Sequence, residues 1–205
     1  AESGLMSVTG SEESGPVKVG APMLDIGAGL ATVTALLAAH VTRLETGIGS
    51  DVSSSLLEFA LASFTTIASD VASTGTNPNL LGSHSSSFAP YGGFRARDGD
   101  LVLAGAGDER LWVTFCDTLG RPELSHDPRF GDNGSRLANR DELTVEIEAA
   151  LQADDVETWL DRFNAAGVPA GRVQSLTDVL ESEQVRALDI LRTATGAAIN
   201  SIPAV

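Results

Sequence analysis

The residue best suited to chemistry in this sequence is Asp25, at the start of its longest apolar helical pattern. Aspartate is a favoured N-cap residue, worth about 1 kcal/mol, so a purely structural role explains this position well. A helix N-terminus also stabilises anions, so we expect Asp25 to stay ionised and able to face a thioester or phosphate group. An ionised, positioned carboxylate is what nucleophilic catalysis by aspartate requires. On the residues alone, both roles stay open.

Two glycines follow Asp25 in the first turns of the same pattern. Gly27 and Gly29 each cost a helix about 1 kcal/mol relative to alanine. Glycine allows another backbone or a bulky ligand to approach closely, which makes both positions candidates for substrate binding. A dinucleotide-binding fingerprint is disfavoured, because Thr32 occupies the third glycine position and Pro22 interrupts the strand that should come before it.

Other kinds of site find little support. The three histidines His40, His84 and His126 are far apart and show no metal-ligand spacing, so we expect no metal. The sequence has no nucleophile elbow and no phosphate-binding Walker loop. The single cysteine, Cys116, lies between Phe115 and Asp117 in a short helical pattern and is expected in the core.

Composition limits the class of protein. The 205 residues are 42% hydrophobic and carry a net charge of −15, which argues against a nucleic-acid partner. One cysteine excludes an internal disulfide and fits a cytoplasmic location. We expect no membrane span, because no uninterrupted apolar run reaches the ~18–20 residues that a bilayer requires. Neither end has the features of a natural terminus, so we expect an internal piece of a longer protein.

The first part of the sequence predicts two long helices. Apolar residues recur at intervals of three and four between residues 26 and 44, which predicts a core-facing helix with Asp25 as its N-cap. Short strands are expected at residues 17–19 and 49–54. A capping box of Ser55 and Glu58 predicts a second helix over residues 55–73, and residues 75–79 form a clear break.

The remainder predicts a mixed α and β region. Residues 94–103 form an expected hairpin, with Asp98 and Gly99 supplying positive φ angles at its turn. Helices are expected at residues 110–119, 140–152 and 155–166, followed by a strand and a helical turn over residues 173–180.

An ordered set of motifs is similar to the pattern of the family III coenzyme A transferases, a family that includes formyl-CoA transferase and the α-methylacyl-CoA racemases. The set covers nearly the whole chain with plausible spacing, and its specificity lies in the order rather than in any single motif. Its segments are residues 4–10, 22–29, 43–49, 51–58, 89–92, 98–99, 112–116, 119–122, 127–130, 136–140, 159 and 166–171.

The resemblance implies a role for Asp25 as the catalytic nucleophile of a CoA transferase. In such enzymes the aspartate attacks an acyl-CoA to form a mixed anhydride, and the released thiolate then forms an aspartyl-CoA thioester. CoA acts as a substrate, and an acyl-CoA and a small carboxylic acid are the implied partners. His84 and Tyr91, together with Gly27 and Gly29, are the candidate substrate-binding residues under this resemblance. The CoA-binding residues are expected mostly upstream of Ala1.

The same resemblance implies an α/β fold. Residues 1–75 are expected to end a Rossmann-like, CoA-binding large domain, residues 76–185 to form a small α+β domain, and residues 186–205 to begin a return to the large domain. Members of the family form interlocked homodimers. Because about half of such an enzyme is missing here, we expect no transferase activity from this chain alone.

Three alternatives stay open. Residues 82–87, which include His84, can form either a lid over the site or a plain linker. The racemases of this family use the matching aspartate for proton transfer, and Asp108 can replace their glutamate, although a helix N-cap explains Asp108 better. Finally, the chain can be a non-catalytic domain that keeps the fold without the chemistry.

Overall fold

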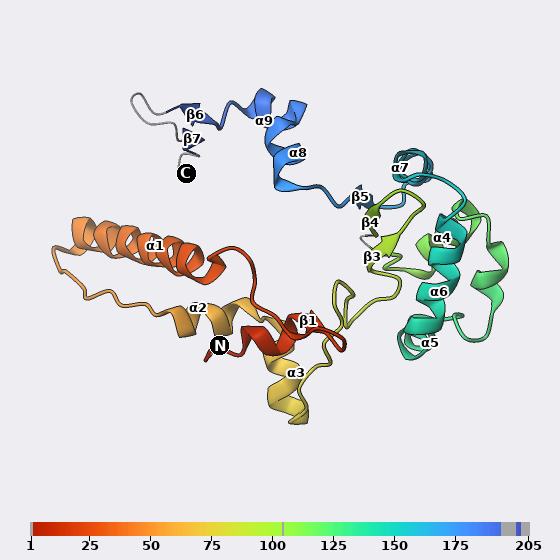
Figure 1. Ribbon diagram of the computed structural model, residues 1–205. Helices are drawn as coiled ribbons and strands as arrows, with labels where there is room; N and C mark the ends of the chain where they lie inside the picture. Colours follow the sequence, from red (N-terminus) through yellow and green to blue (C-terminus); the bar gives the residue numbers. More distant parts are fainter. Residues whose placement is uncertain (1, 104, 194–199, 202–205) are drawn as a thin grey trace. The chain divides into compact units, whose positions relative to one another are not determined.

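The computed structural model describes residues 2–103, 105–193 and 200–201, and these residues form two compact units (Figure 1). The first unit is Ala1–Ser87 and the second is Phe88–Val205. The boundary between the units lies further along the sequence than the domain boundary expected at residue 75. The reason is that Leu81 forms an isolated bridge with Ser11, and the Gly82 N–H donates to the Gly10 carbonyl at 2.7 Å. The expected assignment to large and small domains stays a prediction.

The first unit is dominated by helix α1, Met23–Thr46. The helix begins three residues earlier than expected, with Pro22 in place of Asp25 at the N-cap position, so the prediction of Asp25 as N-cap is wrong. Proline fixes its own φ near the helical value and suits a helix start, which moves Asp25 into the first turn. The helix ends at Gly47, which adopts a φ of 74° and whose N–H donates to the Arg43 carbonyl at 2.9 Å.

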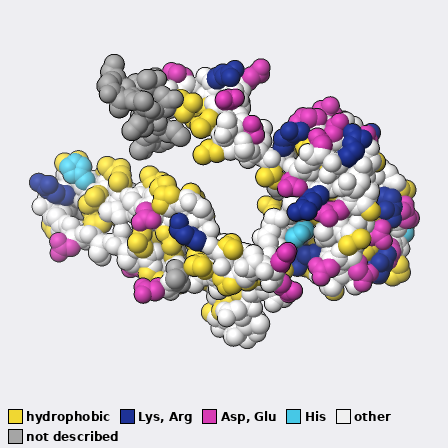
Figure 2. Space-filling model, in the orientation of Figure 1, with side chains coloured by type: hydrophobic (Ala, Val, Ile, Leu, Met, Phe, Trp, Pro, Cys, Tyr) yellow, Lys and Arg dark blue, Asp and Glu magenta, His cyan; other side chains and the backbone are white. Residues whose placement is uncertain are grey.

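The apolar stripe of α1 is exposed in this chain rather than facing a core. Its side chains are more than half exposed, and Figure 2 shows hydrophobic side chains gathered along this helix. The stripe consists of Ile26, Leu30, Val33, Leu36, Leu37, Val41 and Leu44. By length and composition α1 is also able to cross a membrane, as are the next two helices if that bent pair is counted as one span. The core-facing expectation fails here because the described part of the unit offers the stripe no partner.

The rest of the first unit is short and irregular. A 3-10 helix, η1 (Leu5–Val8), is followed by two antiparallel strands, β1 (Gly10–Ser11) and β2 (Gly15–Pro16), while the strands expected at residues 17–19 and 49–54 are absent from the described residues. Ser55 caps the next helix as predicted, accepting from the Glu58 N–H at 3.1 Å. The single helix expected over residues 55–73 is instead α2 (Leu56–Ser63) and α3 (Thr66–Thr74), broken at Thr65 with a φ of 49°.

The second unit has a three-stranded antiparallel sheet. Strands β3 (Gly92–Arg95) and β4 (Asp100–Leu103) form the expected hairpin, and β5 (Ala170–Arg172) pairs with β4 on its other side. The turn is longer than predicted, because the Ala96 N–H donates to the Gly99 carbonyl and Gly99 does not take a positive φ. The turn therefore extends from Ala96 to Gly99, and the prediction of positive φ angles at Asp98 and Gly99 is wrong.

Helices on this sheet complete a well-packed core. They are α4 (Glu109–Thr118), η2 (Pro122–His126), α5 (Asn133–Ala138), α6 (Arg140–Leu151) and α7 (Val156–Ala166), close to the expected positions of the three longer ones. Helix α6 contacts β3, and α7 contacts both β5 and α4. The core includes Phe94, Trp112, Phe115, Cys116, Leu124, Phe130, Leu143, Ile147, Leu151, Trp159 and Phe163.

The chain then continues through two short helices, α8 (Leu176–Glu181) and α9 (Glu183–Leu188), and two paired strands, β6 (Arg192–Thr193) and β7 (Asn200–Ser201). The strand expected after residue 173 lies earlier, in β5, because it completes the sheet beside β4. Much of the expected return segment, residues 186–205, lies outside the described residues. The fold is mixed α and β, and the expected Rossmann-like sheet stays a prediction.

Candidate active site around Asp25

Asp25 is the third residue of α1 and its side chain is exposed. Within the part of the chain that the structure describes, its carboxylate forms no hydrogen bond or ion pair. Pro22 provides no side-chain cap. Among the N–H groups of the three helical residues before Ile26, that of Met23 donates to the Ala21 carbonyl at 2.9 Å, and the other two have no partner among the described residues. The helix start therefore places an unpaired carboxylate beside backbone N–H groups that are able to bind an anion.

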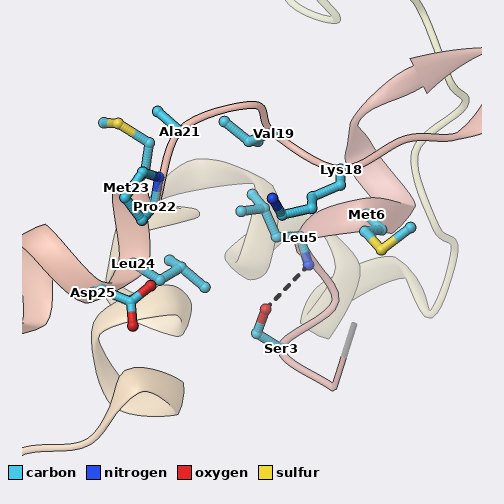
Figure 3. Close-up of a pocket in the computed structure, with 10 residues that line it drawn as sticks. All are labelled: Ser3, Leu5, Met6, Lys18, Val19, Ala21, Pro22, Met23, Leu24 and Asp25. Carbon is cyan, nitrogen blue, oxygen red and sulfur yellow. Dashed lines mark hydrogen bonds between the residues drawn. The ribbon is translucent and has the colours of Figure 1, made fainter.

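A cavity of about 210 Å³ opens beside this helix start (Figure 3). Its wall is largely apolar, and Lys18 and Asp25 are its two charged lining residues. The other lining residues are Ser3, Leu5, Met6, Val19, Ala21, Pro22, Met23 and Leu24. A small, mostly apolar cavity with a few convergent polar groups is the usual form of a small-molecule site.

Sequence reasoning missed Lys18. The signal that could have found it is its uniqueness, because it is the only lysine among the 205 residues. In Figure 3 its side chain extends from the strand side of the cavity, with the amino group directed toward the start of α1. Lys18 places a positive charge in the wall of the cavity that Asp25 also lines.

The two candidate glycines have different surroundings. A Cβ added at Gly27 would overlap the ring of Phe59 in α2, whereas a Cβ at Gly29 would meet nothing within 4 Å. Gly27 thus permits the close approach of α1 and α2. The group that approaches this glycine in the structure is the Phe59 side chain, where a ligand was expected. Neither glycine is among the cavity-lining residues, and their roles in substrate binding stay predictions.

The structure does not place His84 or Tyr91 at this cavity. His84 is half-buried in the loop after Leu81, where its N–H donates to the Leu81 carbonyl at 3.0 Å. The first residue of that loop, Gly82, is bound to Gly10, so any lid movement must begin beyond it. Tyr91 belongs to the second unit, where it is exposed and packs beside Gly105. Their substrate-binding roles also stay predictions.

Two residues of the second unit are explained structurally. Asp108 caps α4, its carboxylate accepting from the Leu111 N–H at 2.7 Å, as the capping interpretation predicted. Cys116 is fully buried, and this burial raises the pKa of its thiol to about 12, which is typical of an unreactive core cysteine. No three His, Cys, Asp or Glu side chains in the described ranges cluster as metal ligands, and the metal-free expectation stays a prediction.

The family model of CoA-transferase family III matches residues 1–205. The chain belongs to CoA-transferase family III. The resemblance predicted from the ordered motifs is therefore confirmed.

Relatives of this family III chain are named as CoA-transferases. Over 185 residues it is 34% identical to succinyl-CoA:glutarate CoA-transferase of Mus musculus, covering 90% of this chain and 42% of the relative. Over 197 residues it is 32% identical to acetyl-CoA:oxalate CoA-transferase of Acetobacter aceti, covering 96% and 50% respectively. The chain thus spans about half the length of the curated relatives it matches.

Solved structures agree on the fold. A CaiB/BaiF family protein from Brucella suis is 26% identical with a TM-score of 0.76, and the match covers 98% of this chain and 56% of that one. A protein of M. tuberculosis gives a TM-score of 0.83 at 23% identity, covering 99% of this chain and 54% of that one. The likeness to the second protein concerns the fold alone.

Proposed function

We propose that the full-length protein carrying this chain transfers CoA from an acyl-CoA to a carboxylic acid, with Asp25 as the nucleophile. The observation that carries the proposal is the unpaired Asp25 carboxylate at a helix start that lines a cavity, in a chain of CoA-transferase family III. An unpaired carboxylate held at a cavity wall is available to attack an electrophilic carbonyl carbon.

The proposed reaction proceeds through four balanced exchanges. The Asp25 carboxylate attacks the donor thioester, forming a mixed anhydride and releasing the CoA thiolate. The thiolate attacks the aspartyl carbonyl carbon, giving an aspartyl-CoA thioester and the free donor acid. The acceptor carboxylate attacks this thioester and releases the thiolate, which then attacks the acceptor carbonyl carbon of the new anhydride. The products are the acceptor acyl-CoA and the regenerated carboxylate.

The surroundings of Asp25 support these steps physically. Each attack develops negative charge on a carbonyl oxygen, and the free N–H groups of the first turn of α1 are donors that can stabilise it. Most of the residues that line the cavity beside Asp25 are apolar. Electrostatic stabilisation and covalent catalysis together replace any need for a metal in this scheme.

Trapping the covalent intermediate tests the proposal. Full-length protein is incubated with acetyl-CoA or succinyl-CoA and then with borohydride, which reduces an aspartyl thioester or anhydride to homoserine. We expect peptide mass spectrometry to find the modification at Asp25. Asp25→Asn keeps the side chain's size but removes the nucleophile, and it is expected to abolish transfer while the far-UV circular dichroism stays unchanged. An enzyme that transfers CoA with an unmodified Asp25 would refute the covalent mechanism.

The alternatives give different results in the same experiment. A racemase would exchange the α-proton of a 2-methylacyl-CoA with deuterated water and form no trapped intermediate. A non-catalytic domain would do neither. The Asp108 carboxylate, which can replace the glutamate of the racemases in this sequence, accepts a hydrogen bond as the cap of α4.

The remaining parts of the expectation are proposals about the whole protein. We propose a Rossmann-like CoA-binding half outside this chain, an interlocked homodimer and a cytoplasmic location. Of the described apolar residues in the first unit, only Ala28 and Ala60 are buried, which supports a further part of the protein covering this unit. We also propose that residues 1–205 alone have no transferase activity, which the same assay on the isolated chain would test.

A further inference from the structure

Lys18 has no described function, and its position in the cavity suggests one. Its side chain forms no ion pair or hydrogen bond within the described residues, although the chain carries a net charge of −15 and offers many carboxylates. Both Lys18 and Asp25 line the same cavity, yet no ion pair joins these two described residues. The cavity therefore holds opposite charges with space between them.

The backbone holds Lys18 in place. The preceding residue, Val17, donates its N–H to the Thr9 carbonyl at 3.0 Å, and its own carbonyl accepts from the Thr9 hydroxyl at 2.6 Å. The same Thr9 hydroxyl also lies 3.0 Å from the Leu5 carbonyl at the start of η1, so its one proton is shared between the two carbonyls. The two hydrogen bonds of Val17 restrain the backbone next to Lys18, whose own side chain is exposed. The segment that carries Lys18 is thus hydrogen-bonded to η1, and Lys18 lies in the cavity wall (Figure 3).

We propose that Lys18 binds the non-reacting carboxylate of a dicarboxylic acid substrate and so determines specificity at this site. This inference rests on the proposed function of Asp25. One carboxylate of the acid reacts at Asp25, and the second reaches across the apolar cavity to the Lys18 ammonium group. A lysine is a compact point charge well suited to one remote anion, and a charge-assisted hydrogen bond is among the stronger polar contacts.

The chemistry of the cavity favours two-ended acids over simple ones. A monocarboxylic acid of the same length would leave its apolar end beside the Lys18 charge, displacing water from the ammonium group without replacing its hydrogen bonds. A dicarboxylate supplies those bonds. Two relatives are named for the dicarboxylates glutarate and oxalate, which agrees with a site of this kind.

Matched acids and matched variants test the inference in the full-length protein. CoA transfer from acetyl-CoA, a donor without a second carboxylate, is measured to glutarate and to valerate, and to succinate and to butyrate. Lys18→Met is expected to lower kcat/KM for the dicarboxylates roughly ten- to a hundredfold and to leave the monocarboxylates nearly unchanged. Lys18→Arg is expected to restore part of the dicarboxylate preference. Arg43→Met removes one exposed positive charge at the far end of α1 and is expected to change neither class.

A second measurement does not depend on turnover. Glutarate, but not valerate, is expected to slow the acetylation of Lys18 by an amine-reactive reagent, followed by peptide mass spectrometry. Two outcomes would place the CoA phosphates at Lys18 and overturn the inference. One is an equal loss of kcat/KM for both acid classes in Lys18→Met, and the other is protection of Lys18 from acetylation by CoA alone. A wild-type protein that transfers CoA to none of these acids would instead count against the proposed function, while glutarate protection would still report the binding site.

Discussion

At the scale of single residues, Arg136 combines burial with several hydrogen bonds of its guanidinium. It is 1% exposed, and its guanidinium donates to the Ala89 carbonyl at 2.7 Å, the Phe130 carbonyl at 3.1 Å and both oxygens of Glu109 at 3.0 Å. It also lies over the ring of Trp112, 5.0 Å from its centroid. One buried cation therefore joins the chain before β3, α4 and the loop before α5.

Replacing this arginine should destabilise the second unit. Arg136→Met leaves two buried carbonyls without donors, so we expect a loss on the order of 3 kcal/mol in the free energy of unfolding. Urea denaturation followed by tryptophan fluorescence measures it, because both tryptophans lie in this core. Arg110→Met, which removes an exposed arginine of α4, is the control and should cost little. Equal effects would refute the assigned role.

The partner of Arg136 predicts a pH dependence. The hydrogen bonds from Arg136 lower the pKa of Glu109 below its ordinary value. A carboxylate whose pKa is lower in the folded state adds stability above its unfolded pKa, and that stability is lost as pH falls through the folded value. Glu109→Gln should therefore flatten the acid side of the stability curve, measured by urea denaturation between neutral and acidic pH. An unchanged slope would contradict this linkage.

At the scale of elements, the α1–α2 pair provides a matched comparison of two glycines. Gly27→Ala would push a methyl group into the Phe59 ring and should destabilise the pair by about 1–3 kcal/mol. Gly29→Ala meets open space and should stabilise α1 by about 1 kcal/mol. Hydrogen exchange on full-length protein measures the protection of α1 and α2 in each variant.

Activity then separates packing from binding at the same positions. If Gly29 contacts substrate, as predicted, Gly29→Ala should lower kcat/KM while leaving α1 fully protected from exchange. Gly27→Ala combined with Phe59→Leu should recover most of the lost protection, since the shorter side chain makes room for the methyl group. Failure of that rescue would mean that Phe59 is not what requires glycine at position 27.

At the scale of the whole molecule, the two units differ in what they bury. The second unit has the continuous core and a surface rich in charged side chains, so residues 88–193 should fold alone and cooperatively (Figure 2). Cys116 is a direct probe, because its burial and raised pKa protect the thiol from alkylation until the core opens. We expect native protein to resist a thiol reagent and urea-unfolded protein to react at once.

The first unit should behave differently. Residues 1–87 expose the α1 stripe, so the isolated unit is expected to bind the dye ANS or detergent, whereas the full-length protein is not. Full-length protein should also stay in the supernatant when membranes are sedimented, if the stripe packs against protein as we propose. If the full-length protein sediments with membranes, that result would instead favour a role for α1 in crossing the membrane.

The sequence by itself determined the family, the three longer helices of the second unit and a carboxylate at the start of the longest helix. These features depend on caps, periodicities and motif order, which act over a few residues or along the chain. Only the tertiary structure decided which surfaces meet. Phe59 lies against Gly27, Arg136 donates to Ala89 from 47 residues away, and Lys18 shares a cavity with Asp25. Such contacts depend on the path of the backbone between the partners, which local patterns do not encode.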